Sequence, residues 1–252
     1  FEEMNIKKEV FKKIDDLAKD GAILASNTST LDIDEIASVT KRPGDVVGTH
    51  FFSPANVMRL LEIVRGIETK IDVLATLMQL AKKIAKVGII AGNCDGFIGN
   101  RMFHAYITQA HLLVEEGATP EQVDIAAESW GWAMGPFAVN DLAGNDVGWR
   151  IRKGKGKDYY KGKKYASTVA DRLCELGRFG QKVGKGFYTY DPQTRSRQSD
   201  PEVAKIIDDV RREKGINPRA IDNDEILSRL HGALVIEGTR ILEEGHALRS
   251  SD

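Results

Sequence analysis

Residues 46–64 read VVGTHFFSPANVMRLLEIV, which is two strand-like runs joined by a short turn-like segment. If the turn centres on Asn56, antiparallel pairing places His50 opposite Glu62, because the two numbers sum to twice the number of the turn's centre. Directly opposed side chains have Cβ atoms roughly 4.5–5.5 Å apart. The sequence therefore predicts an imidazole within hydrogen-bonding distance of a carboxylate.

A pair made of His50 and Glu62 is suited to general-base chemistry. The carboxylate fixes the tautomer of the imidazole and stabilises its protonated form, which a base working near neutral pH requires. The alternative is a half-buried structural pair, which is the commoner reason for a His and a Glu to lie on neighbouring strands. Other residues have to decide between the two interpretations.

The pattern that precedes this stretch predicts a parallel α/β unit. Apolar residues recur at helical spacing over 5–19, with Glu3 and Lys7 as a supporting i,i+4 pair on the surface. The apolar positions of this helix are Val10, Phe11, Ile14, Leu17 and Ala18. Residues 22–25 then indicate a short buried strand, and a helix followed by a buried strand is typical of α/β folds.

The character of the sequence changes after Asp95-Gly96, because the remaining periodic segments are nearly all helical. Before that point, 71–86 predicts a helix and 87–90 a last apolar strand. Beyond it, helices are expected over 97–116, from 119 onward, and over 138–147, 168–176, 201–213 and 223–245. We therefore expect domain boundaries near residues 93 and 192, and an α/β part followed by all-α parts.

Composition indicates an ordinary soluble protein with a small-molecule partner. The chain has 252 residues, and 36 Lys plus Arg balance 37 Asp plus Glu, so no global field would attract nucleic acid. Its apolar stretches are far shorter than the roughly 20 residues that cross a bilayer, so no membrane helix is expected. Two cysteines without paired spacing fit a reducing compartment and predict neither zinc nor a redox couple.

Polar residues after the first strand are a candidate ligand site. Ser26-Asn27-Thr28-Ser29-Thr30 lies where the carboxyl end of a strand meets a loop, which is where open α/β sheets bind ligands. Such residues also cap helices and bond to their own backbone, and without further context we favour that structural interpretation. Asn100, on an early turn of the long helix, either orients a substrate oxygen or makes a structural hydrogen bond between domains.

Three further features are interpreted without a ligand. The basic, glycine-rich segment 150–164 is expected to be a solvated loop, although it has the charge to meet phosphates. His104 and His111 lie seven residues apart on one predicted helix and are interpreted as packing or surface residues, since no third ligand accompanies them. Trp130 and Trp132 are expected to form a core cluster at a helix end.

Several motifs in the same order resemble the 3-hydroxyacyl-CoA dehydrogenase family. They are Ser26-Asn27-Thr28-Ser29, His50-Phe51-Phe52-Ser53-Pro54, Glu62, Gly96-Phe97-Ile98-Gly99-Asn100-Arg101, Met134-Gly135-Pro136-Phe137, Asp141-Leu142-Ala143-Gly144 and 176–188. The sequence looks most like the dehydrogenase part of multifunctional fatty-acid β-oxidation enzymes, which join an enoyl-CoA hydratase module to the dehydrogenase.

The resemblance implies a fold with three parts. Residues 1–92 would form the later part of a Rossmann-like NAD-binding domain, 93–191 a helical substrate and dimerisation domain, and 192–252 a second helical domain. No Gly-x-Gly-x-x-Gly occurs in the sequence, although that turn receives the pyrophosphate of a dinucleotide. The chain is therefore expected to start beyond the first βαβ unit of the family.

The same resemblance assigns an activity and its residues. It implies NAD-dependent oxidation of (3S)-3-hydroxyacyl-CoA to 3-oxoacyl-CoA, with His50 as the general base and Glu62 as its support. Ser29 and Asn100 would hold the reacting oxygen. Residues on the cofactor side would be Asn27, Ser29, Ser53 and Arg172, and no metal site is implied.

The resemblance also carries expectations about partners and location. A homodimer through the helical domain, or fusion to an upstream hydratase module, is expected, with no nucleic acid or membrane partner. The location would be cytoplasmic, or peroxisomal if the source is eukaryotic. The competing hypothesis is a non-catalytic helical scaffold or a fragment that binds acyl-CoA only, because the glycine turn is missing from the sequence.

Overall fold

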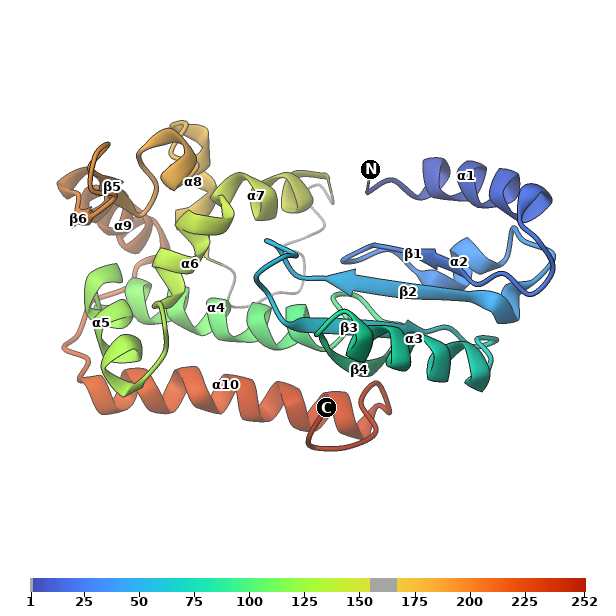
Figure 1. Ribbon diagram of the computed structural model, residues 1–252. Helices are drawn as coiled ribbons and strands as arrows, with labels where there is room; N and C mark the ends of the chain where they lie inside the picture. The colour runs from blue at the N-terminus through green and yellow to red at the C-terminus, as the bar shows by residue number, and fades with distance from the viewer. Residues whose placement is uncertain (1, 155–166) are drawn as a thin grey trace. The chain divides into compact units, whose positions relative to one another are not determined.

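The computed structural model describes residues 2–154 and 167–252 (Figure 1). The chain forms two compact units, which we call the sheet unit (Phe1–Phe103 with Val235–Asp252) and the helical unit (His104–Leu234). Residues 235–252 thus pack with the sheet unit, although the sequence assigns them to a second helical domain. No described helix is both long enough and apolar enough to cross a bilayer.

A four-stranded sheet organises the sheet unit. Its strands are β1 (Leu24–Ser26), β2 (Val46–Phe51), β3 (Leu60–Arg65) and β4 (Val87–Gly92), in the spatial order β1-β2-β3-β4. The β1–β2 and β3–β4 pairs are parallel, whereas β2 and β3 form the antiparallel pair that the sequence predicts. Within that pair His50 lies opposite Glu62, so the predicted register is confirmed.

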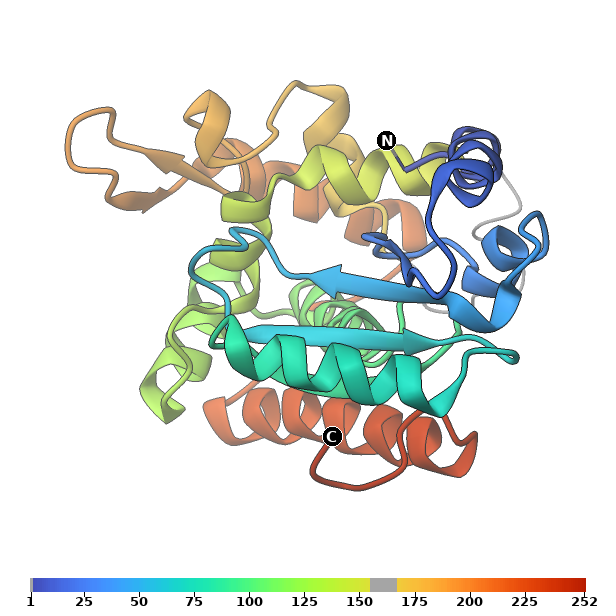
Figure 2. The ribbon, with the colours of Figure 1, turned by 45° about the vertical axis from the view of Figure 1, so that its right-hand side comes forward.

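Helices cover both faces of this sheet. The sheet unit holds α1 (Met4–Leu17), α2 (Ile33–Ala37), α3 (Ile71–Lys83) and a 3-10 turn over Pro43–Asp45. Figure 2 shows α3 along the face of β3, where its apolar side chains pack with Leu61 and Ile63 in one core cluster. A second cluster joins side chains of α1 and α2 to Val46 and Val64, because successive strand residues point to opposite faces.

The orientation of α1 differs from the sequence prediction. Of its predicted apolar stripe only Phe11 is deeply buried, whereas Val10 and Leu17 are 43% and 86% exposed. Asp15, on the same side as Phe11, is buried because its carboxylate accepts hydrogen bonds from the Lys41 backbone N–H and from Arg42 Nε, both at 2.7 Å. A polar anchor and Phe11 therefore fix the helix, with Ala18 partly buried against the same cluster, while Val10, Ile14 and Leu17 are exposed.

The helical unit confirms the helical character predicted beyond residue 95. Its helices are α5 (Pro120–Trp130), α6 (Pro136–Ala143), α7 (Asn145–Gly154), α8 (Val169–Glu175) and α9 (Pro201–Lys214), with a 3-10 turn over Gln181–Val183. Two longer helices, α4 (Gly99–Glu116) and α10 (Asn223–Glu243), contribute residues to both units. The Thr119 side chain caps α5 by accepting from Gln122 N at 3.1 Å.

Two details of the helical unit were not anticipated. Residues 188–190 and 197–199 form a small antiparallel hairpin, β5 (Tyr188–Tyr190) with β6 (Arg197–Ser199). Trp130 and Trp132 do not form the expected core cluster, since they are 60% and 36% exposed and pack on the ring of His231.

The basic segment 150–164 begins in α7, and the rest of it lies outside the described residues.

Candidate active site

The His50 and Glu62 side chains meet on the face of the β2–β3 pair. His50 Nδ1 lies 2.6 Å from Glu62 Oε2, and the two residues are 5% and 0% exposed. An ionised carboxylate only accepts hydrogen bonds, so the proton of a neutral imidazole belongs on Nδ1. This assignment leaves Nε2 of His50 as the basic atom.

Backbone amides at the start of α4 hold the second carboxylate oxygen. Glu62 Oε1 accepts hydrogen bonds from Ile98 N at 3.0 Å and from Gly99 N at 2.8 Å. The first amides of a helix have no partner inside the helix and carry its positive partial charge. A buried carboxylate is therefore well matched to this position, and both of its oxygen atoms are engaged.

Aromatic rings enclose the imidazole. The rings of Phe52 and Phe97 have centroids 4.3 and 5.8 Å from that of His50. Phe97 follows Gly96, and their φ angles of +50° and +79° form the tight turn that leads into α4. A side chain at Gly99 would come within 2.7 Å of Phe52, so this glycine permits the close approach of ring and backbone.

The predicted loop 26–30 lies beside the end of β2. Ser26 at the end of β1 pairs with Gly48, and the Asn27 side-chain oxygen accepts from Phe51 N at 3.3 Å. Ser29 lies two residues further on, after the buried Thr28, and is partly exposed. The pairing thus brings Asn27 and Ser29 to the same edge of the sheet as His50, as the sequence predicts for residues at a strand's carboxyl end.

Glu2 organises this loop and was missed by sequence reasoning. Its Oε1 accepts from Thr28 Oγ1 at 2.6 Å, from Ser29 N at 2.8 Å and from Ser29 Oγ at 3.3 Å. Burial alone would raise the pKa of Glu2, but these hydrogen bonds and one from Thr30 N outweigh it and lower the pKa. Of these hydrogen bonds, the one from Ser29 Oγ is longer than those from Thr28 Oγ1 and Ser29 N.

Lys7 was assigned to a surface pair with Glu3, but it contacts the loop. Its Nζ donates to Ser26 Oγ at 3.0 Å and to the Asn27 carbonyl at 2.8 Å. The sequence alone gives little reason to place Lys7 at the loop, because any exposed lysine on this helix has the same local pattern. Only the packing of α1 beside β1 selects Lys7.

The remaining predicted residues are less closely tied to the pair. Asn100 follows Gly99 on the first turn of α4, next to the amides that hold Glu62. Ser53 is exposed just beyond β2. Arg172 lies on α8 in the helical unit, where it forms an ion pair with Glu213, so its role toward a cofactor stays a prediction.

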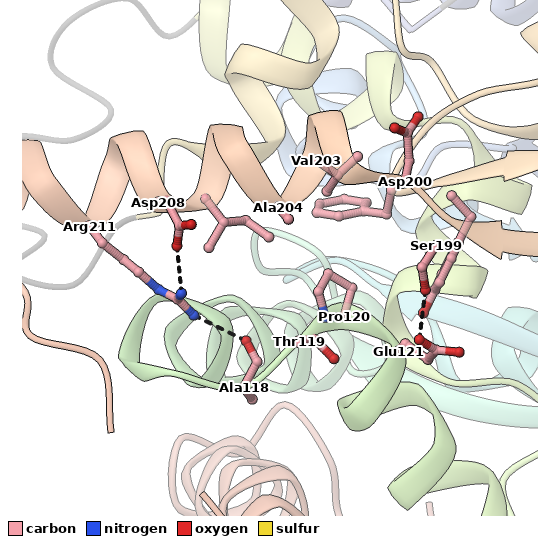
Figure 3. Close-up of a pocket in the computed structure, with 13 residues that line it drawn as sticks. Ala118, Thr119, Pro120, Glu121, Ser199, Asp200, Val203, Ala204, Asp208 and Arg211 are labelled. Carbon is pink, nitrogen blue, oxygen red and sulfur yellow. Dashed lines mark hydrogen bonds and ion pairs between the residues drawn. The ribbon is translucent and has the colours of Figure 1, made fainter. Parts of the chain in front are cut away.

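A separate hollow lies within the helical unit. It has a volume of about 230 Å³ and is lined by α5, α9 and the hairpin, with Val203 and Pro120 toward its apolar part and Glu121, Asp200 and Asp208 among its polar residues (Figure 3). None of the predicted site residues lines it. Among the described residues no three His, Cys, Asp or Glu side chains are placed to hold a metal ion.

The residues at the edge of the sheet fit the nicotinamide end of NAD. The exposed Asn27 carboxamide and the partly exposed Ser29 hydroxyl are polar groups beside a buried imidazole, where a planar amide-bearing ring can be bound and oriented. The fold and this pair define a Rossmann-like α/β unit with a buried His–Glu pair near the carboxyl ends of its first strands.

Comparison with known proteins identifies the family. Residues 1–94 match the 3-hydroxyacyl-CoA dehydrogenase NAD binding domain, and residues 96–190 match the 3-hydroxyacyl-CoA dehydrogenase C-terminal domain. The structure of (S)-3-hydroxybutyryl-CoA dehydrogenase from Ralstonia eutropha is 30% identical, with a TM-score of 0.67, over 76% of this chain and 68% of that one. The chain belongs to the 3-hydroxyacyl-CoA dehydrogenase family, which confirms the resemblance.

Multifunctional enzymes are among its similar proteins. The peroxisomal bifunctional enzyme of Cavia porcellus is 50% identical over 98% of this chain, and the chain spans 36% of that relative's length. The dehydrogenase part of multifunctional enzyme 1 from C. elegans is 36% identical, with a TM-score of 0.70, over 100% of this chain and 56% of that one. The likeness therefore extends past the matched domains into residues 191–252.

Proposed function

We propose that this chain carries the NAD-dependent oxidation of (3S)-3-hydroxyacyl-CoA to 3-oxoacyl-CoA in fatty-acid β-oxidation. The observation that supports it most is the buried contact of 2.6 Å between His50 Nδ1 and Glu62 Oε2. Family membership supplies the reaction class, and the pair supplies a base with one free nitrogen. His50 is the proposed general base, and Glu62 keeps its imidazole oriented.

The proton transfer follows from the tautomer. His50 Nε2 takes the proton of the substrate's 3-hydroxyl, and the ring becomes an imidazolium whose charge the Glu62 carboxylate stabilises. The chemistry that NAD would supply when bound is a hydride acceptor for C3 of the substrate, whose hydroxyl would become a carbonyl. The apolar rings of Phe52 and Phe97 limit water around the imidazole, so the carboxylate acts on it more strongly than it would in bulk solvent.

Ser29 and Asn100 are proposed to hold the reacting oxygen. The hydrogen bond from Ser29 Oγ to Glu2 is long, at 3.3 Å, so the Ser29 hydroxyl can turn and donate to the substrate oxygen while the proton of that oxygen points to His50 Nε2. The Asn100 carboxamide, next to the turn that holds Glu62, can donate to the same oxygen as it becomes a carbonyl. Asn27 and Ser53, together with Arg172, are proposed to lie along the cofactor.

The direct test is NADH formation by the natural full-length polypeptide. We expect absorbance of NADH to rise with (3S)-3-hydroxyacyl-CoA and NAD, and to stay flat with the (3R) enantiomer, because only one face of C3 presents its hydrogen to the nicotinamide. His50→Gln is the matched inactive control. Binding of acyl-CoA by a protein that forms no NADH would overturn the proposal and support the scaffold hypothesis.

Partners and location are proposed on the same basis. We infer fusion to a hydratase module, because the curated relatives are named bifunctional or multifunctional proteins. The alternative arrangement is a homodimer through the helical domain, which the family resemblance implies. If the source is eukaryotic, the peroxisome is the proposed compartment, since those relatives are named peroxisomal. Sedimentation of the natural polypeptide and its hydratase activity test the two arrangements separately.

A further inference from the structure

We propose that Arg101 and two carboxylates, Glu237 on α10 and Glu244 directly after it, form a clamp that positions Glu62 and, through it, the His50 imidazole. The proposal rests on the proposed function, in which His50 is the base. All of its parts lie within the sheet unit. Arg101 touches none of the reacting atoms, so it is a positioning residue.

Arg101 is anchored by both carboxylates. Its Nε and Nη2 donate to Glu237 Oε1 at 2.9 and 2.6 Å, and its Nη1 donates to Glu244 Oε2 at 2.6 Å. The side chains of Arg101 and Glu237 are each only 16% exposed, so solvent screens this contact weakly. Hydrogen bonds between charged groups are about twice as strong as neutral ones. The contact with Glu237 is therefore stiffer than an exposed ion pair, whereas Glu244, whose side chain is 47% exposed, adds a more solvated contact.

The guanidinium also braces the turn that holds Glu62. Arg101 Nη1 lies 3.8 Å from the sulfur of Cys94, which begins the turn, and Arg101 N donates to the Gly96 carbonyl at 3.2 Å. Ile98 and Gly99, whose amides bind Glu62 Oε1, lie between Gly96 and Arg101 in the sequence. Arg101 thus ends the segment that aims those amides, and its side chain and its backbone N–H both contact the turn that precedes them.

The end of α10 is fixed to the same sheet. Gly92 N at the end of β4 donates to the His246 carbonyl at 2.7 Å, and Ile241 is fully buried in the cluster that contains Phe97 and Ile98. A side chain at Gly92 would meet His246 at 2.6 Å, so β4 and the segment after α10 are in close contact. The segment that carries Glu237 and Glu244 is therefore held firmly against the sheet.

A spectroscopic experiment tests this role without turnover. In the full chain labelled with ¹⁵N-histidine, ring nitrogen shifts report which tautomer His50 adopts. For the double variant Glu237→Gln, Glu244→Gln we expect the Nδ1–H population of His50 to fall between those of the wild type and Glu62→Gln. Glu243 is an exposed residue of α10 that directly precedes Glu244. The variant Glu243→Gln is therefore the matched control and should leave the His50 signals unchanged.

Stability and rescue separate positioning from simple loss of fold. Arg101→Lys keeps a charge but not the forked geometry, so it should give a smaller tautomer change than the double variant. If unfolding temperature falls in the double variant while the His50 tautomer is unchanged, the clamp is only structural and the proposal is wrong. Because the readout needs neither NAD nor substrate, an inactive wild type would contradict the proposed function and leave this test valid.

Discussion

Glu62 in the sheet unit and Asp124 in the helical unit are built alike. Both carboxylates are 0% exposed, and both accept two backbone N–H groups at the start of a helix. Glu62 takes those of Ile98 and Gly99 at α4, while Asp124 takes those of Phe137 and Ala138 at α6, both at 2.9 Å. In each case the carboxylate fixes how a helix begins.

The third partner separates them. Asp124 Oδ2 accepts from Tyr188 OH at 2.8 Å, a phenol whose pKa burial raises well above its usual value, so the group keeps its proton at neutral pH. Glu62 is paired with the imidazole of His50 through Nδ1, which leaves the Nε2 nitrogen available to a substrate. This difference in the third partner is the reason why we propose Glu62 as the support of a base and interpret Asp124 as structural.

The largest expected effect on hydride transfer comes from removing the base that we propose in the sheet unit. His50→Gln removes the base while keeping a polar side chain, so hydride transfer should fall by about 10²–10⁴, the usual contribution of general acid–base catalysis. Binding of NAD, followed by fluorescence titration, should change little. A variant that turns over at near the wild-type rate would show that another group takes the proton.

The variant Glu62→Gln measures how much the Glu62 carboxylate contributes to the rate of hydride transfer. The amide can still contact the His50 ring but cannot stabilise its positive charge, and a hydrogen bond to a charged group contributes roughly 1.5–3 kcal/mol. Hydride transfer should therefore slow by about 10- to 100-fold, with a changed dependence of rate on pH. An unaltered pH–rate profile would contradict coupling of the two residues. Asp124→Asn in the same assay is the control, with an expected change below about twofold.

His111 in the helical unit provides a pH-dependent contrast. Burial beside Phe137 and Phe187, with smaller effects of Arg152 and Lys214, lowers the pKa of His111 to about 3. The unfolded chain binds a proton near pH 6.5, so this contribution is present above that pH and is lost as the pH falls. Between pH 7 and 5 the loss is about 2 kcal/mol.

The measurement for His111 is urea unfolding at both pH values. The variant His111→Phe should lack that part of the pH dependence, since phenylalanine does not titrate and suits an aromatic site. If the wild type and the variant lose the same free energy of unfolding on acidification, His111 is not held neutral in the folded protein.

Asp124 should give a smaller effect of opposite sign. Burial raises its pKa to about 6 despite the hydrogen bonds from Phe137, Tyr188 and Ala138. The folded protein therefore binds the proton more tightly than the unfolded chain, and stability from this group increases as the pH falls from 7 to 5, by about 1 kcal/mol. In Asp124→Asn that gain should disappear, so the variant should lose more stability on acidification than the wild type does.

The elements and the central pair could be predicted from the sequence because their signals are local. Antiparallel register around Asn56 depends only on residue spacing, and it placed His50 opposite Glu62 as the structure does. The family resemblance predicted the NAD cofactor and the helical domains. The orientation of α1, the exposure of Trp130 and the hairpin depend on which surfaces pack together, and periodicity alone does not contain that information.

The surroundings of the pair were harder to predict than the pair itself. Glu2 and Lys7 reach the ligand loop only through the packing of α1 beside β1, and Arg101 meets Glu237 across 136 positions of sequence. The roles of Ser29, Asn100, Ser53 and Arg172 remain predictions, because hydrogen bonds within the protein do not reveal which groups meet a substrate.

A double-mutant cycle of hydride transfer tests most directly whether His50 and Glu62 act as one unit. The rate is measured for the wild type, His50→Gln, Glu62→Gln and the double variant of the natural full-length polypeptide. Since Glu62 supports the reaction mainly through the imidazole, most of the loss caused by Glu62→Gln should disappear in the His50→Gln background, and the double variant should be little slower than His50→Gln alone. If instead the two losses multiply in the double variant, His50 and Glu62 act independently and do not form one catalytic unit.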